Sequence, residues 1–388
     1  MITALRNLAE QIDTEWKATG YKPADLSGIA ARLLSDIRPD RTFDLSALAD
    51  WTLSQPTFPS ACNPFGPLGP PAFTVWSNQH FFVNVYAYTT PEVVIHDHDF
   101  TGAFMNLSGI TIHCTYEFPD ADLIDDSVHI GGLRLRGIEA ISDGAIRQIE
   151  AGRGFIHQVW HISQPTVVLV VRTPPLDSGT RQFQYIRPSI ATEVFRSDSM
   201  SVESPERFAI TRKMAECLRT SRGAGVDYVK QLVKSERPWD AVWHLIENWR
   251  YLQSEGALDD VIAAGAKYQG EWFARVENAG QEVELFYSIN WPRVVAARDR
   301  IVLALLMSFR SWRSIRKTLE GLLPGVDARE QIVESLGRLA DDRTIALDFK
   351  PSAREALSSM LQNERIENDV AQTLRQQALL RPLLNFDT

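Results

Sequence analysis

The sequence predicts an α+β fold with helices at both ends and a block of short strands between them. Residues 1 to about 55 place apolar residues at spacings of three and four, which is typical of amphipathic helices. From residue 73 to about 175, short β-branched or aromatic segments alternate with turn residues, which indicates a sandwich or barrel. Beyond about residue 190 the helical spacing returns.

We therefore expect an N-terminal helical segment over 1–55, a β-barrel over 56–190 and a helical C-terminal domain over 191–388. A connector with six prolines and two glycines, SQPTFPSACNPFGPLGPPAF, separates the first two parts. In the last part, three helical patterns precede a short strand pattern at Thr344–Leu347, an order that resembles a winged-helix unit over 293–350.

Composition limits the partners that this chain can have. The net charge of −9 argues against nucleic acid and anionic membrane surfaces, and the charges of the winged-helix-like unit cancel between Ser311 and Arg343. The three cysteines lie far apart without a CxxC pair, which indicates neither a disulfide framework nor a zinc knuckle. Acidic Glu10 and Asp13 stand where a secretory signal needs an apolar core, so we expect a cytoplasmic protein.

The segment VVIHDHDFTGAFMNLSG carries two histidines, His96 and His98, in an apolar, strand-like run. Alternate residues of a strand face the same side, so both imidazoles can point into a barrel while Asp97 points away. A third ligand must come from another strand, and His157 in GRGFIHQVWHIS is the candidate, with His161 on the same face. A polar turn would explain two histidines, but three favour a metal site.

These residues resemble the two motifs of the cupin superfamily, G-x5-H-x-H-x3,4-E-x6-G and G-x5-P-x-G-x2-H-x3-N. His96, His98 and Gly109 have the spacing of the first motif, and Gly154-x2-His157 matches the second. The resemblance covers about a quarter to a third of the chain, residues 73–175. It implies a cupin-type β-barrel, also called a double-stranded β-helix, between the N-terminal helices and the helical, winged-helix-like C-terminal domain.

The chain departs from the cupin motifs at several positions. Gly102 and Ala103 stand where the first motif has its glutamate, so the implied site has three histidines and no carboxylate. In the second motif, Gly152 replaces the proline and His161 replaces the asparagine.

A three-histidine cupin with the sequence IHDH resembles the cysteine dioxygenase family in particular. The resemblance implies Fe(II) bound by His96, His98 and His157, with O2 and substrate at the open positions; Zn, Ni or Mn could replace iron in a purified sample. Ala103 and Arg172 stand near the positions of that family's Cys–Tyr crosslink, and its early arginine, which holds the cysteine carboxylate, is absent. A substrate other than cysteine is therefore expected, and a homodimer is the oligomer that the resemblance suggests.

Other side chains of the strands are candidates for the chemistry around the metal. Arg172 could anchor an acidic group of the substrate bidentately, and His113 could line the pocket or a solvated outer face. The candidate catalytic residues, each of which could instead be packed core, are His161, Tyr86 and Tyr88. His244 and Glu247 have helical spacing, but no second pair completes a di-metal set, so we interpret them as structural.

The sequence is compatible with three functions. The first is a non-haem Fe(II) dioxygenase, an oxidoreductase acting with O2 on a small or peptide-linked anionic substrate, of the amino-acid or thiol type. The second is a 2-oxoglutarate-dependent oxygenase of the JmjC kind, although that class needs an acidic residue where His98 stands. The third is a metal-binding cupin without catalysis, which serves as a scaffold or sensor.

Overall fold

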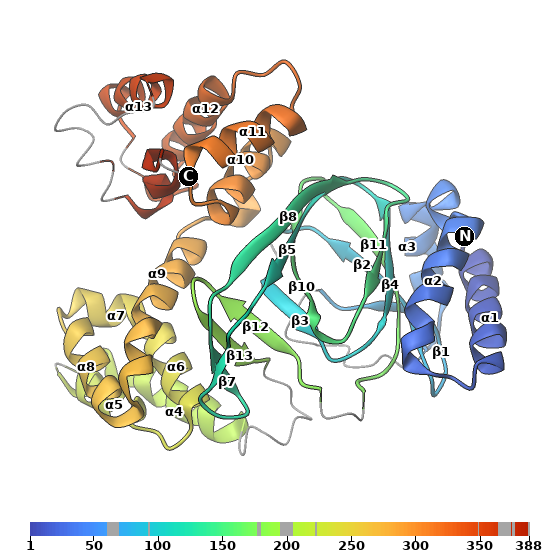
Figure 1. Ribbon diagram of the computed structural model, residues 1–388, viewed down its shortest axis with the longest axis horizontal. Coiled ribbons are helices and arrows are strands. Elements are labelled where there is room, and N and C mark those ends of the chain that lie inside the picture. The colour runs from blue at the N-terminus through green and yellow to red at the C-terminus, as the bar shows by residue number, and fades with distance from the viewer. Residues whose placement is uncertain are drawn as a thin grey trace.

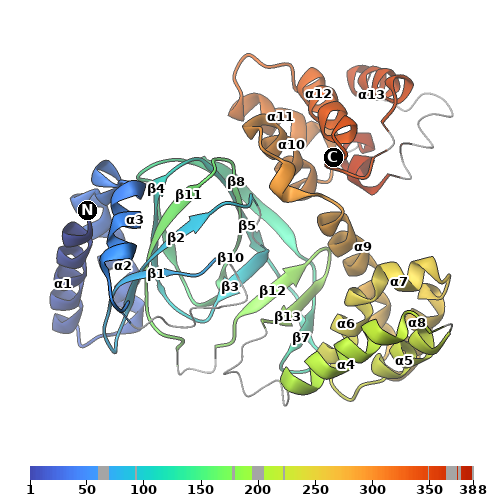
Figure 2. The ribbon, with the colours of Figure 1, turned by 180° about the vertical axis from the view of Figure 1, so that it is seen from behind.

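The computed structural model describes residues 1–59, 70–91, 94–176, 180–194, 205–221, 223–347, 349–363, 374 and 377–386. A β-barrel occupies the middle of the molecule (Figure 1). Helices of the N-terminal segment cover one side of it, and two helical lobes lie on the other side, as the reverse view confirms (Figure 2). The predicted fold class is confirmed.

The N-terminal segment forms α1 (Ile2–Ala18), α2 (Pro23–Ile37) and α3 (Leu45–Ser54). Pro23 at the first position of α2 fits because that position has no intrahelical N–H bond to lose. At α3 the Asp44 carboxylate accepts a hydrogen bond from Ser46 N. The apolar stripes of α1 and α2 pack on one sheet of the barrel, so these helices supply half of the core beneath it.

The barrel consists of two antiparallel sheets. The first has the order β1-β2-β11-β4-β9 and the second has the order β6-β7-β13-β12-β3-β10-β5-β8. The strands are β1 (Phe73–Ser77), β2 (Phe82–Tyr88), β3 (Ile95–His98), β4 (Gly102–Ser108), β5 (Thr111–Glu117), β6 (Asp122–Leu123), β7 (Val128–Ile130), β8 (Arg134–Ile141), β9 (Ile146–Ile149), β10 (Gly152–His161), β11 (Thr166–Arg172), β12 (Phe183–Ile186) and β13 (Ile190–Glu193).

The strand order identifies the topology. Numbered along the chain from β2 to β11, and with the short β6 and β7 left out, the eight core strands have the order 1-8-3-6 in one sheet and 2-7-4-5 in the other. The hairpin of β12 and β13 extends the second sheet beyond β3. The order of the eight core strands is the jelly-roll arrangement of two facing sheets that defines the double-stranded β-helix of cupins. The fold assignment rests on this order.

Residue alternation divides the side chains of the core strands between two faces. In β11, for example, Val167, Leu169 and Val171 pack against the N-terminal helices, whereas Val168 lies with aromatic side chains inside the barrel. In β10, Trp160 faces outward, and its indole N–H donates to the hydroxyl of Ser308. The interior is therefore lined by every second residue of each strand.

The two helical lobes are joined by α9 (Val276–Tyr287) (Figure 1). The first lobe contains α4 (Pro205–Leu218), α5 (Ala224–Leu232), α6 (Pro238–Glu247), α7 (Trp249–Ser254) and α8 (Leu258–Gln269). The second contains α10 (Ala297–Ser308), α11 (Trp312–Leu322), α12 (Ala328–Asp341) and α13 (Pro351–Asn363). The first lobe shares an apolar core with β7 and β13, and α10 packs on the outer face of β5 and β10.

Two details differ from the sequence-based expectation. The hairpin β12–β13 lies beyond the last strand that the pattern predicted, and β12 pairs directly with β3. The short strand predicted at Thr344–Leu347 is wrong, because these residues form a single isolated bridge between Ile289 and Ile345. That bridge closes α9 onto the end of α12, so the predicted winged-helix unit has its three helices without the strand.

Candidate metal centre

Two neighbouring strands bring three histidines together inside the barrel. β3 carries His96 and His98, β10 carries His157, and the two strands pair so that His157 lies opposite His96. Strand alternation directs His96 and His98 to the same face, as the sequence predicts. All three side chains are buried, with at most 7% of each residue exposed.

The three imidazoles meet through their Nε2 atoms. Nε2 of His157 lies 3.1 Å from Nε2 of His98 and 3.3 Å from Nε2 of His96. Two nitrogens bound to one metal ion at about 2.1 Å each are about 3.0–3.4 Å apart at octahedral or tetrahedral angles. The nitrogen–nitrogen distances therefore match those around a shared ion, and these residues fit a metal.

The tautomer of His96 is set by a backbone carbonyl. Its Nδ1–H donates to the carbonyl oxygen of Val94 at 2.8 Å. In the neutral ring Nε2 therefore carries no proton, and its lone pair is available to a metal ion. Asp97 between the two histidines faces the opposite way, and its carboxylate accepts from Phe183 N and from the Tyr185 hydroxyl, both at 2.6 Å. Asp97 therefore anchors β3 to β12 and is not a ligand.

A chain of side chains sets the tautomer of His157. Arg147 holds Glu139 through two hydrogen bonds, and these lower the pKa of the Glu139 carboxyl to about 2. Ionised Glu139 accepts from Nδ1 of His113 at 3.0 Å, which leaves Nε2 of His113 as the acceptor for Nδ1–H of His157 at 3.1 Å. Nε2 of His157 consequently carries a free lone pair. Hydrogen-bond partners behind a ligand, here His113 and Glu139, orient the ligand and make it a stronger metal donor.

Burial keeps the ligand histidines neutral. Desolvation lowers the pKa of His96 to about 4 and that of His98 and His157 well below the ordinary value. A neutral imidazole is the form that binds a metal, so no proton has to be displaced at neutral pH. At least two lone pairs, those of His96 and His157, face each other without a proton between them, an arrangement that a cation stabilises.

Three phenylalanine rings surround the histidines. Phe100 lies 4.5 Å from the ring of His98, and Phe155 lies 4.6 Å from the ring of His157. Phe104 reaches His157 from β4, in the opposite sheet, at 6.2 Å. These apolar rings lower the local polarity and strengthen electrostatic interactions at the centre.

Arg172 is a buried cation near the histidine group, from which Phe100 separates it. Its guanidinium carbon lies 4.5 Å from the ring of Phe100, which itself stacks beside His98, and the arginine is buried. Burial is the main cause of the lowered pKa of His98, and the charge of Arg172 lowers it further. The structure thus places the predicted anion anchor next to the histidine group.

The close approach of β4 and β11 explains why position 102 carries no glutamate. A Cβ atom added to Gly102 would lie 2.0 Å from the carbonyl oxygen of Val171 and 2.9 Å from the Cα of Arg172. Both atoms belong to the backbone of β11, which cannot move aside without breaking its pairing with β4. This packing excludes a side chain at position 102, one of the two positions that the glutamate of the cupin motif could occupy.

The other predicted site residues form a second group in the barrel. The ring of His161 stacks on Tyr88 at 3.9 Å, its Nδ1 lies 3.2 Å from the hydroxyl of Thr111, and Tyr88 stacks with Tyr86 at 6.3 Å. His161 is four residues beyond His157, about 13 Å along a strand. The predicted catalytic roles of His161, Tyr86 and Tyr88 stay predictions.

His113 lies inside the barrel beside His157, and its predicted role in substrate binding stays a prediction. Both of its ring nitrogens are engaged by protein groups, one by Glu139 and the other by His157. Sequence reasoning missed Glu139 and Arg147, whose signal is cross-strand: His113 lies directly opposite Glu139 in the β5–β8 pair. It also missed the phenylalanine wall, which only the folded barrel assembles.

Comparisons with known proteins add nothing to the fold assignment, which rests on the strand order. No protein-family model matches the sequence, and no curated protein matches it either. One matching solved structure is an uncharacterised Klebsiella pneumoniae protein with a double-stranded β-helix domain, 15% identical, over 36% of this chain and 86% of that chain, with a TM-score of 0.19. A likeness this weak carries no argument.

The fold and the site together define a cupin-type barrel with a buried three-histidine group that could bind a metal ion. In the described part of the chain, these histidines are the one group of three potential ligands, and their ligand atoms all lie within 4.8 Å of one another. Among the same residues, no helix has the length and apolar character needed to cross a bilayer.

Proposed function

We propose that the barrel is the catalytic part of a non-haem Fe(II)-dependent oxygenase. The observation that carries this proposal is the convergence of three buried imidazoles, two of them with a fixed tautomer, inside a cupin-type barrel. Imidazole ligands suit iron among other transition metals, and three protein ligands leave coordination positions open. When bound, iron(II) would supply the redox chemistry and the open positions for O2 and substrate.

The residues around the histidines would prepare the site for an anionic substrate. The chain Glu139–His113 orients His157, and Phe100 and Phe155 exclude water beside the ligands. Three neutral ligands leave the charge of a divalent ion uncompensated, which favours a thiolate or carboxylate donor. Arg172 can bind an acidic group of the same substrate bidentately. We therefore propose a small or peptide-linked substrate of the amino-acid or thiol type.

A metal-binding cupin without catalysis is the second candidate. It is favoured by the hydrogen bonds that occupy both ring nitrogens of His113, and by Ala103 at the position of the crosslinking cysteine in the family that the sequence resembles. The 2-oxoglutarate reading has less support, because Asp97 is directed toward β12 and away from the histidines.

Metal analysis combined with oxygen uptake tests the proposal. The full-length protein, reconstituted anaerobically with Fe(II), should bind about one iron per chain and consume O2 with at least one thiol or amino acid. His157→Ala should abolish both while circular dichroism is unchanged, and the control His80→Asn, at the β1–β2 turn, should change neither.

Two results would decide against an oxygenase. Absence of iron binding would contradict the proposed iron site. Iron binding without O2 consumption across the thiol and amino-acid panel would favour the non-catalytic cupin instead.

A further inference from the structure

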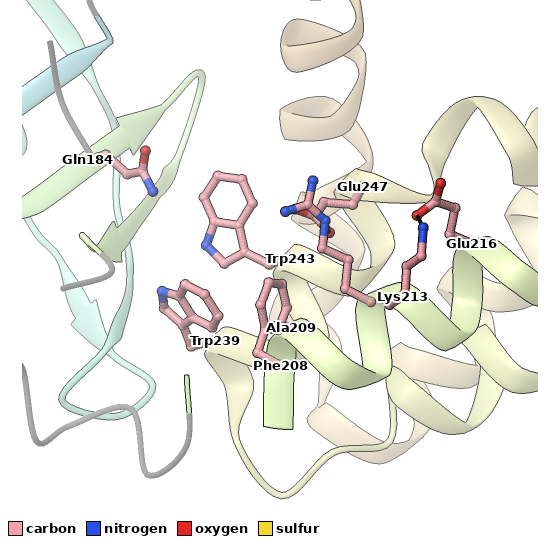
Figure 3. A pocket seen from close by; sticks show the side chains of 9 residues that line it. Gln184, Phe208, Ala209, Lys213, Glu216, Trp239, Trp243 and Glu247 are labelled. Carbon is pink, nitrogen blue, oxygen red and sulfur yellow. Dashed lines mark hydrogen bonds and ion pairs between the residues drawn. The ribbon is translucent and has the colours of Figure 1, made fainter. Parts of the chain in front are cut away.

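Two cavities lie on either side of α6 in the first helical lobe. One, of about 520 Å³, opens between this lobe and Gln184 of β12, with Phe208, Trp239 and Trp243 on its wall (Figure 3). Its charged groups satisfy one another: Lys213 pairs with Glu216 at 2.9 Å and Arg212 with Glu247 at 3.0 Å. This cavity therefore presents an aromatic wall whose neighbouring charged groups are ion-paired.

The second cavity, of about 430 Å³, is polar and has buried groups that lack partners. It lies between α4, α5, α6 and α8, and its inner wall includes Arg237, Asp240 and His244. Asp240 is 4% exposed and His244 is 1% exposed. In the described residues, no hydrogen-bond partner exists for Nη1 of Arg237, Oδ1 of Asp240 or Nδ1 of His244. Buried polar atoms are nearly always paired, so these three require a ligand or water.

The positions of these residues on α6 make them one surface. His244 follows Asp240 by four residues, so both lie on one face of α6, and Arg237 immediately precedes the helix at its N-cap. Nη2 of Arg237 donates to Oδ2 of Asp240 at 2.6 Å. That bond holds the pair and leaves one nitrogen of the guanidinium and one oxygen of the carboxylate unused.

The hydrogen-bond roles of the unused atoms follow from their neighbours. The hydroxyl of Thr211 donates to a backbone carbonyl of α4, so it accepts from Nε2–H of His244, which lies 3.1 Å away. Burial, then the charges of Arg207 and Arg237, lower the pKa of His244 to about 4, so the ring is neutral and Nδ1 is an acceptor. The inner wall of the cavity thus holds two acceptors one helical turn apart, beside one guanidinium donor, and all three atoms have almost no surface open to solvent.

From this arrangement we infer that the cavity binds a free α-amino acid. An ammonium group has enough N–H donors to bond both Oδ1 of Asp240 and Nδ1 of His244, and an adjacent carboxylate would accept from Nη1 of Arg237. The N-terminus of α6 begins at Pro238, beside Arg237, and its dipole favours the same carboxylate. A cavity of about 430 Å³ is within the usual range for a small-molecule site.

The site is independent of the barrel chemistry. None of its groups belongs to the three-histidine centre, and the cavity is lined by helices of the first lobe and by residues 234–237. The inference therefore stands or falls without reference to the proposed oxygenase. An amino acid bound here would stabilise the packing of α4 and α5 against α6 by occupying three otherwise unsatisfied atoms.

Calorimetric titration of the full-length protein with each of the common L-amino acids tests the inference. At least one should bind with a Kd of about 1 mM or tighter. Its decarboxylated amine and its deaminated acid should each bind at least about tenfold more weakly, because each loses one half of the recognition.

Two substitutions and one control locate the binding to this cavity. Asp240→Asn keeps the size of the side chain but removes the charge, and should weaken binding at least about tenfold. Thr211→Val removes the hydroxyl that fixes the tautomer of His244, and should weaken binding without unfolding the lobe. Glu255→Gln, an exposed change at the end of α7, should leave the Kd unchanged.

Three outcomes would overturn the inference. The first is no binding by any amino acid at about 10 mM, which would mean that water alone fills the cavity. The second is equal affinity for the decarboxylated amine. The third is an unchanged Kd in both Asp240→Asn and Thr211→Val while thermal unfolding shows that both variants are folded.

Discussion

The two sheets of the barrel face each other with different chemistry. The sheet that contains β3, β10 and β5 directs its histidines inward, and two of the three ligand tautomers are set within it or at its edge. The opposite sheet, with β2, β11 and β4, contributes Phe104, Arg172 and the two tyrosines of β2. Under the proposed function, the first sheet would hold the metal and is called the metal-binding sheet. The second would present groups to a substrate and is called the substrate-facing sheet.

The outer faces of the two sheets pack against different helices through different kinds of contact. The substrate-facing sheet is backed by the apolar stripes of α1 and α2, which need only van der Waals contact. The metal-binding sheet is backed by α10 through polar as well as apolar contacts, including the bond from Trp160 to Ser308. Directional bonds fix strand positions, and ligands of a metal must be held within about 0.5 Å of their geometry.

The largest expected effect comes from the contact between strands of the substrate-facing sheet. Gly102→Glu restores the glutamate of the cupin motif, yet its Cβ would clash with the backbone of β11. We expect a loss of at least about 3 kcal/mol in the free energy of unfolding and no added metal ligand. Thermal unfolding and metal affinity measure both effects. A stable variant that binds metal more tightly would contradict the structural reason for the missing glutamate.

The next largest effect concerns the hydrogen-bonded chain behind His157 in the metal-binding sheet. Glu139→Gln removes the charge that holds His113, and through it His157, in one tautomer. We expect metal affinity to fall about 10- to 100-fold, measured by competition with a chelator. Glu117→Gln, on the same sheet but paired only loosely with Arg134 at 4.0 Å, is the matched control and should leave the affinity unchanged. Equal effects of the two substitutions would argue against the orienting chain.

Arg172→Met tests whether substrate binding and metal binding are assigned to different sheets. The substitution preserves a long apolar side chain over Phe100 but removes the guanidinium. Iron content should be unchanged, whereas KM for an anionic substrate should rise about tenfold or more, as for a lost charged hydrogen bond. Loss of iron together with activity would mean that Arg172 supports the metal-binding sheet instead.

The smallest effect is a pH dependence of stability. Hydrogen bonding to Arg147 lowers the pKa of Glu139 from its ordinary 4.5 to about 2. A lowered carboxyl pKa stabilises the fold above pH 4.5, and this contribution is lost as the pH falls from 4.5 toward 2. The stability gap between wild type and Glu139→Gln in urea should therefore narrow over that interval. A gap that stays constant would show that Glu139 acts by size alone.

Much of the fold could be predicted because its signals are local. The 3.6-residue spacing in the first 55 residues gave the N-terminal helices, and the alternation of IHDH placed His96 and His98 on one face. The glycine spacings added His157 from a second strand. The hairpin β12–β13 was missed because its segment, FQYIRPSIATE, is short and lies after a turn-rich stretch that resembles the end of the barrel.

The sequence by itself determined the strand-rich middle, the inward direction of the histidines and the absence of a carboxylate ligand. Only the tertiary structure decided that Glu139 backs His113, that β11 excludes a side chain at Gly102, and that His244 faces a cavity. Side-chain direction follows from the backbone of one strand or helix. Contacts between strands and helices far apart in the chain depend on register and packing, which no local pattern encodes.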